Sequence, residues 1–311
     1  AMAAAAFKKA VLNGSPLICM LCLVFVLSPV TVTSNIIYLG FLDPFNLLLT
    51  VFYFYIADTK AAAFLTPIIC VAGITVHYQF VLAFLPAILS LEIYYICKDK
   101  KGRALRIASL VVSLFLSIAV AVYLIFFSRY HVKMDEDALY DYMCAKFTDY
   151  NSWGLFKDYF TYYIYGKFDG GDYTNPVDFV RFLLNVSIKG LNRRSMLGYA
   201  AALVPVYGLL EYFWVYTLRR AEKGRRLPYL IFMLQPFVLA AAMIASTDNA
   251  RWAGASIFSN YALLFTVIRN GETGVWEAAK RLEKRWVLWL LTAVFLAGYV
   301  IALVTMKTLL I

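Results

Sequence analysis

The feature that most constrains this chain is a series of apolar runs, each close to the length that crosses a lipid bilayer. About 20 apolar residues, each adding about 1.5 Å of helix, span a hydrocarbon core of roughly 30 Å. The segments 105–127 and 286–306 are continuously apolar and lack the alternation of a membrane β-strand. Since a chain in lipid must pair its backbone polar groups internally, these runs predict transmembrane helices.

Runs of this kind recur along the whole chain. They cover residues 16–39, 44–57, 61–76, 78–97, 105–127, 197–218, 228–246, 253–268 and 286–306. The runs 44–57 and 61–76 are short for a full crossing and are predicted to be tilted, buried half-spans or a re-entrant pair. We therefore expect an all-α integral membrane fold with about seven full transmembrane helices, a short helix pair and one large extracytoplasmic loop. The expected parts are an N-terminal transmembrane bundle (1–127), the loop with short helices (128–196) and a C-terminal transmembrane bundle (197–311).

The composition excludes a soluble fold. Hydrophobic residues make up 62% of the chain and charged residues only 15%, whereas about 25% of residues are charged in an ordinary soluble domain. Too little polar sequence remains to cover a core of this size. Lipid must cover the rest.

The positions of the basic residues predict the topology. The net charge is +10, but Lys and Arg gather in the short segments 98–106, 219–226 and 269–285 between apolar runs. Lys8 and Lys9 place the N-terminal end in the cytoplasm, and each basic segment then follows an even number of crossings, so all face the cytoplasm. This pattern is typical of membrane topology, and no nucleic acid is expected as a partner. The opening AMAAAAFKK is typical of a cut chain end, which leaves room for further helices before residue 1.

The same topology places the long segment 128–196 on the outer side. It carries nine Lys/Arg and nine Asp/Glu, hence no net charge, and it is rich in Tyr and Phe. A long loop with its own apolar content is typical of a lid or a binding element, while aromatic residues at this level also serve as interfacial anchors. Both readings stay open. Residues 168–172 are predicted to form a turn.

The sequence Asp248-Asn249-Ala250-Arg251-Trp252, between two apolar runs on the outer side, is the clearest candidate site. Asp248 and Arg251 can face one another on a helical turn, and an arginine fork binds carboxylate or phosphate in a bidentate way. One interpretation is a structural ion pair with Trp252 as an anchor at the membrane surface. The other is a clamp for a lipid-linked phosphate or diphosphate.

Two further residues are candidate catalytic groups on the outer side. His77 lies between two apolar segments with Tyr78 and Gln79 adjacent, and it is either a hydrogen-bonded structural residue or a base. Asp43, just before Pro44, is either a helix N-cap, which is the favoured reading, or a catalytic carboxylate.

Several basic residues of the long loop are possible phosphate or sugar contacts. They are Arg129, His131, Arg181, Arg193 and Arg194. Two span carboxylates, Glu92 and Glu211, lie close enough to the cytoplasmic side to reach water and are not expected to act. The Cys19-x-x-Cys22 pair lies in an apolar run, which favours two small core residues over a redox or metal pair. No metal site and no cofactor is predicted, because no nucleotide-binding or zinc-protease motif occurs.

Two of these segments resemble motifs of bacterial polytopic membrane proteins from surface-polysaccharide loci. Residues 76–80 running into 84–86 are similar to a His-containing helix start before an apolar run with proline, and residues 248–252 to an Asp-x-x-Arg-Trp turn before a late span. The group includes O-antigen and capsule polymerases and other polyprenyl-phosphate-dependent glycosyltransferases. One departure is that Tyr78 follows His77 where an acid is expected.

The resemblance implies transfer or polymerisation of polyprenyl-diphosphate-linked glycan units at the outer face of a bacterial inner membrane. It implies that Arg251 holds phosphate, that Asp248 or His77 acts as a base or orients the acceptor, and that loop aromatics stack on sugars. Membrane lipid and the polyprenyl-phosphate-linked glycan are then the expected partners. Two alternatives from other classes stay open: a transporter or flippase for a lipid-linked or small anionic substrate, and a non-catalytic membrane scaffold.

Overall fold

The computed structural model describes residues 2–27, 43–77, 79–99, 101–126, 135, 137–138, 141, 167–168, 171–172, 193–244, 249–286, 289 and 292–293. This part of the chain is helical, as predicted, apart from one pair of two-residue strands. Strand β1 (Lys167–Phe168) pairs antiparallel with β2 (Gly171–Asp172), in agreement with the predicted turn.

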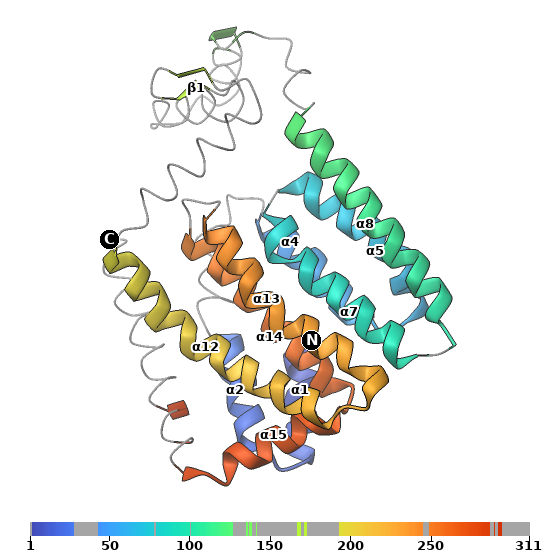
Figure 1. The fold of residues 1–311 in the computed structure, drawn as a ribbon, viewed down its shortest axis with the longest axis vertical. Helices are drawn as coiled ribbons and strands as arrows, with labels where there is room; N and C mark the ends of the chain where they lie inside the picture. The colour runs from blue at the N-terminus through green and yellow to red at the C-terminus, as the bar shows by residue number, and fades with distance from the viewer. Residues whose placement is uncertain are drawn as a thin grey trace.

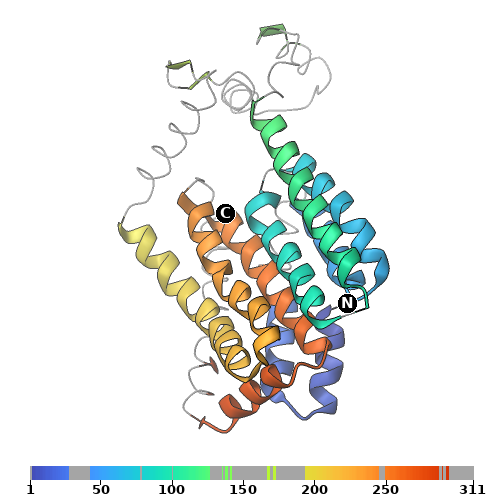
Figure 2. The same cartoon turned by 45° about the vertical axis from the view of Figure 1, so that its right-hand side comes forward.

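The long helices lie side by side in an antiparallel bundle (Figures 1 and 2). The first half contains α4 (Asp43–Ile56), α5 (Lys60–Val76), α6 (Phe80–Ala83), α7 (Leu85–Lys98) and α8 (Arg103–Phe126). The second half contains α12 (Arg193–Arg220), the 3-10 turn η2 (Lys223–Arg225), α13 (Arg226–Ile244) and α14 (Asn249–Arg269). The shorter helices α1 (Met2–Leu12), α2 (Pro16–Leu27) and α15 (Thr273–Glu283) pack around the lower end of the second half in Figure 1.

The three basic segments gather at this lower end. Lys98 Nζ lies 3.1 Å from Glu272 Oε1, α7 contacts η2, and Arg269 lies 3.5 Å from Asp58 in the α4–α5 turn. We call this the basic end. The opposite end, where α5 finishes and α14 begins, is called the loop end.

The α8 helix turns polar side chains toward the protein and apolar ones away from it. Its buried face carries Arg106, Ser109, Ser113 and Ser117, each at most 5% exposed. Its outer face carries large apolar side chains that are 41–69% exposed: Ile107, Val111, Val112, Leu114, Phe115, Ile118 and Val122. In a water-soluble protein the apolar stripe of a helix faces the core instead.

Other helices share this arrangement. The inner faces of α4 and α5 bury Asn46, Thr50 and Thr66 completely. Their outer faces carry side chains that are 46–65% exposed: Phe45, Leu48, Phe52, Tyr55, Phe64 and Ile68. So many exposed large apolar side chains are unusual on a soluble monomer and are typical of a surface that meets lipid or another protein.

Two helical segments of the described chain are long and apolar enough to cross a membrane, Phe80–Lys98 and Arg103–Leu124. The predicted short pair is present as two shorter apolar helices, Pro44–Ile56 and Lys60–Val76. Within the predicted run 78–97, the helix is locally irregular at Phe84, between α6, which ends at Ala83, and α7, which begins at Leu85. Pro86 contributes to this local break, since proline has no N–H to donate to the carbonyl one turn earlier.

Gly73 allows the chain to reverse tightly between α5 and α6. A Cβ at this position would overlap the ring of Phe80, which is completely buried. We expect Gly73→Ala to lower the free energy of unfolding by about 1–3 kcal/mol, because the ring can move only by disturbing its neighbours. Thermal unfolding of the purified protein in detergent measures this change.

Gly208→Ala on α12 is the matched control, since a Cβ there meets no atom within 4 Å. It should be neutral or stabilise by up to about 1 kcal/mol, because alanine favours helix. Equal melting temperatures for the two variants would contradict the close packing at Gly73.

Candidate functional site

His77 is held in extended backbone at the C-terminus of α5, with φ −159° and ψ 132°. Its N–H donates to the Gly73 carbonyl at 3.1 Å, and its ring Nδ1 accepts the Gln79 N–H at 3.2 Å. A neutral imidazole that accepts at Nδ1 carries its proton on Nε2. The ring is therefore fixed in one tautomer and is half-buried.

Two completely buried amide side chains lie beside His77, Asn46 from α4 and Gln79 from the start of α6. Asn46 Nδ2 donates to the His77 carbonyl at 3.3 Å. Asn46 Oδ1 and both polar atoms of the Gln79 side chain have no hydrogen-bond partner among the described residues. We call Asn46, His77 and Gln79 the amide cluster.

Unpartnered amides are costly in a protein interior. Each buried polar group without a hydrogen bond costs about 1–3 kcal/mol, and most such groups in native proteins are paired. The three unpaired atoms at the amide cluster comprise two acceptors and one NH₂ donor group. This set can bind a ligand that offers both hydroxyl hydrogens and lone pairs, as a sugar does.

The middle of α14 packs against α6, one turn from this cluster. α14 packs against α4 and α6, and Ser259 Oγ donates to the Ala83 carbonyl at 2.6 Å. Gln79 lies one turn before Ala83, and Trp252 lies two turns before Ser259. Both residues are therefore nearer to the loop end than the Ser259–Ala83 contact is. Trp252 is 3% exposed and therefore packs inside the protein.

The structure brings some of the predicted site residues to one end. α4 begins at Asp43, with Pro44 in its first turn, and Arg251 lies in the first turn of α14. The side chains of Asp43, Arg251, Arg193 and Arg194 lie outside the described residues, although the two last residues begin α12. Asp248, Arg129, His131 and Arg181 lie wholly outside them. The described residues contain no group of three or more His, Cys, Asp or Glu placed to hold a metal ion.

A second polar group, which the sequence reading missed, lies near the basic end. Glu92 is completely buried, and its Oε1 accepts the hydroxyls of Tyr53 and Thr66, each at 2.9 Å. Its Oε2 accepts Arg106 Nη1 at 3.0 Å. Arg106 also donates to the Ala57 and Thr59 carbonyls, at 2.7 and 3.1 Å. Because the carboxylate oxygens and the guanidinium already have partners, this group holds the helices together and has little hydrogen-bonding capacity left for a ligand.

A third polar group lies at the α14–α15 turn. Gly271, with φ +76°, closes α14 and lets the Glu272 N–H reach back to the Val267 carbonyl. The Glu272 carboxylate accepts the Tyr94 hydroxyl at 2.6 Å and the Tyr229 hydroxyl at 3.1 Å, and it pairs with Lys98. Burial alone would raise the pKa of Glu272, but the Tyr94 hydrogen bond and the Lys98 charge outweigh it and lower that pKa below its usual value.

Arg106→Met tests the buried pair. It leaves the Glu92 carboxylate buried without its counter-charge, so the free energy of unfolding should fall by about 3–5 kcal/mol. Arg103→Met, which removes an exposed charge from the first turn of the same helix, is the control and should change little. The double change Glu92→Leu with Arg106→Met should recover part of the loss in thermal unfolding. No recovery would contradict the assignment of the loss to an unpaired carboxylate.

Glu272 should make stability depend on pH. Its native pKa is lowered, so its stabilising effect is fully present above the ordinary value of 4.5 and is lost as the pH falls through the lowered value. The melting temperatures of the native chain and Glu272→Gln should therefore differ at neutral pH and converge in acid. Glu277→Gln, which removes a half-exposed carboxylate paired with Arg220, controls for the loss of one charge at this end. A difference that persists unchanged in acid would contradict this role.

The described residues thus contain three different polar groups. Glu92 and Arg106 form a structural pair, Glu272 stabilises a turn, and the amide cluster has unpaired polar atoms. Comparison of the chain with protein-family models, with curated proteins and with solved structures gives no match. The chemistry of this site therefore has to be argued from its own residues.

Proposed function

We propose that the chain is a polytopic protein of a bacterial inner membrane, with seven full transmembrane helices and α4–α5 as the short pair. The outward apolar faces of α4, α5 and α8 support this, because they expose side chains that lipid would cover favourably. The basic end would then face the cytoplasm, by the positive-inside rule, and the loop end the outer side.

Within that frame we propose a glycan-assembly enzyme, a polymerase or glycosyltransferase, acting on polyprenyl-diphosphate-linked sugars at the loop end. The observation that carries this is the amide cluster, with three buried amide atoms left unpaired beside His77. A ligand hydroxyl could satisfy these groups on binding, and buried amides that need a ligand's hydrogen bonds discriminate strongly in its favour.

The proposed roles follow from position. Arg251, in the first turn of α14, would hold the diphosphate, while the amide cluster orients the sugar. An acceptor hydroxyl attacks the anomeric carbon, the bond from that carbon to the diphosphate oxygen breaks, and the diphosphate leaves. Asp248 takes the proton of the hydroxyl, while His77, whose Nδ1 already accepts the Gln79 N–H, orients the acceptor through its Nε2–H.

A transporter or flippase is the second candidate. Such a protein would place its charged binding pair near the middle of the spans. The buried pair within the described helices, Glu92–Arg106, lies instead beside the α4–α5 turn and binds its backbone carbonyls. This pair therefore does not supply the binding site that a transporter would need.

Gln79→Met tests the proposal by separating stability from function. It removes an unpaired buried amide, so the melting temperature should stay the same or rise. If that amide binds substrate, formation of surface glycan in the host should fall at least about tenfold, since two hydrogen bonds are lost. Glycan chain length on gels and thermal unfolding of the purified variant measure the two effects.

Gln235→Met is the matched control, because this buried amide on α13 is already paired with Ser90 Oγ at 2.6 Å and the Pro86 carbonyl at 3.3 Å. Gln235→Met should lower the melting temperature, and it should reduce surface glycan only as far as the amount of folded protein falls. Unchanged glycan in a stably expressed Gln79→Met variant, together with unchanged glycan in Arg251→Ala, would favour the scaffold and reject the enzyme.

A further inference from the structure

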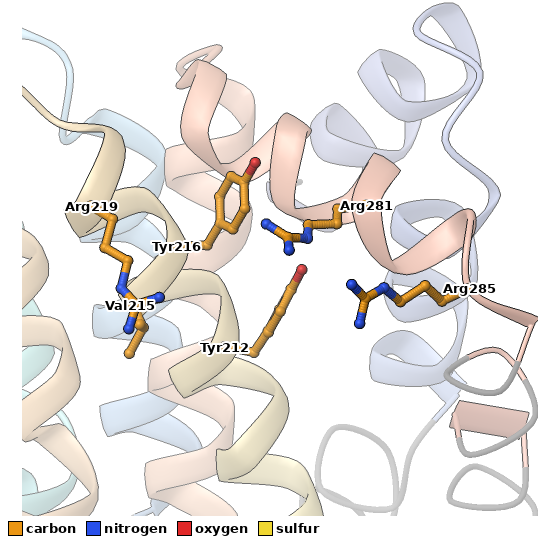
Figure 3. A pocket seen from close by; sticks show the side chains of 6 residues that line it. All are labelled: Tyr212, Val215, Tyr216, Arg219, Arg281 and Arg285. Atoms are coloured by element: carbon orange, nitrogen blue, oxygen red, sulfur yellow. The ribbon is translucent and has the colours of Figure 1, made fainter.

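A pocket of about 210 Å³ opens at the basic end, between the last turns of α12 and the end of α15. Figure 3 shows Tyr212 and Tyr216 of α12 facing the guanidinium groups of Arg281 and Arg285. Val215 and Arg219 complete the lining on the α12 side. The pocket lies at the opposite end of the bundle from the amide cluster, because α5 starts beside Arg269 and is about 25 Å long.

The pocket carries three positive charges that are not neutralised. Within the described residues, no carboxylate lies within 4.0 Å of Arg219, Arg281 or Arg285, and all three are exposed. The nearby Glu277 pairs instead with Arg220, at 3.4 Å. Arg281 lies over the Tyr216 ring, 5.9 Å from its centroid, which holds its guanidinium at the pocket. Two arginines beside a tyrosine hydroxyl, Arg281 and Arg285 at Tyr212, are a favourable arrangement for a phosphate group (Figure 3). Arg219 adds a third positive charge on the other side of the pocket.

The frame of the pocket is already rigid. Gly274 lets α15 approach α12 so closely that a Cβ there would lie 2.9 Å from Thr217 Cα. The Tyr212 hydroxyl donates to the Ala278 carbonyl at 3.4 Å, a second link between the two helices. A ligand would therefore find the helices and Tyr212 already in place, which reduces the entropy lost on binding.

An open apolar groove adjoins the pocket. It has a volume of about 460 Å³ and is lined by Leu218, Arg219, Arg226, Leu227 and Leu230. Arg219 lines both spaces, so the groove continues from the pocket. Leu227 and Leu230 are 53% and 47% exposed and offer an apolar track along α13. The pair of spaces thus has one cationic compartment and one apolar one, which matches an amphipathic ligand with an anionic head.

We propose that this pocket binds the phosphate headgroup of an anionic phospholipid from the leaflet at the basic end, with an acyl chain along Leu227 and Leu230. Arg281 and Arg285 donate to the phosphate, and Arg219, which lines both spaces, adds a positive charge between the headgroup and the acyl chain. This rests on the proposed membrane location, and not on the proposed glycan chemistry. Anionic lipids attract basic residues at a membrane surface, but the paired spaces add a defined site to that attraction.

The test is lipid retention by the full chain reconstituted in phosphatidylcholine nanodiscs containing a minor fraction of phosphatidylglycerol. Native mass spectrometry after mild extraction counts the lipids that stay bound. The native chain should retain phosphatidylglycerol preferentially, and the double variant Arg281→Gln with Arg285→Gln should bind it at least about tenfold more weakly, because charged hydrogen bonds are lost. All three pocket arginines are exposed, so these variants should fold.

The matched control is Arg103→Gln together with Lys101→Gln, which removes two exposed charges at the same end, outside both spaces. It should retain the lipid. Equal loss of bound phosphatidylglycerol in the pocket variant and in the control would show that charge alone attracts the lipid. That result would overturn the proposed site. A second result would also overturn the proposal: the chain shows no preference between the two phospholipids, and millimolar inorganic phosphate displaces the bound lipid. The pocket would then bind a free anion and not a phospholipid. Either result leaves the glycan assay with Gln79→Met unaffected, so failure here and failure of the proposed enzyme are distinguishable.

Discussion

The buried pair of Glu92 and Arg106 joins the first half of the bundle. Through Tyr53, Thr66 and the carbonyls of Ala57 and Thr59, it connects α7 and α8 to both members of the short helix pair. In lipid, apolar contact gives little reason for one helix to prefer another, so inward polar groups and close packing must select the neighbours. His77 lies at the C-terminus of α5, so its position depends on how α5 is held. Because the pair holds α5 through Thr66, the geometry of the amide cluster depends on this distant pair. Replacing one partner would therefore disturb the loop end as well as the stability of the bundle.

The sequence was informative about which segments are apolar helices and poor at showing which side of each helix faces inward. Apolar length predicted the helices around residues 44–57, 61–76 and 105–127, and the structure has a helix in each. The faces could not be read in the same way, because Ser109, Ser113 and Ser117 are inconspicuous in a run that is apolar nearly everywhere. Arg106 had a usable signal, since a charge one turn inside an apolar run is costly. It was assigned to the preceding basic segment, and its pairing with Glu92 was therefore missed.

The candidate site, too, could be predicted from the sequence only in part. The adjacency of His77 and Gln79 could be read directly, and the structure adds that their contact runs through the Gln79 backbone while its side chain stays unpaired. Asn46 had no such signal, because it reaches His77 only through the packing of α4 against α5. The pocket between α12 and α15 was equally hidden. Its tyrosines belong to a predicted span and its arginines to two different basic segments, and only the docking of α15 on α12 joins them.

The break between α6 and α7 has a mechanical consequence. It leaves α6 as a four-residue segment that begins just after Gln79 and ends at Ala83, whose carbonyl accepts from Ser259 of α14. The segment thus connects the Gln79 amide at one end to Ser259, in the middle of α14, at the other. A displacement of α14 at Ser259 would reach the Gln79 amide over a single helical turn. In the proposed enzyme, phosphate binding at the start of α14 and sugar binding at Gln79 would then influence one another through these two helices.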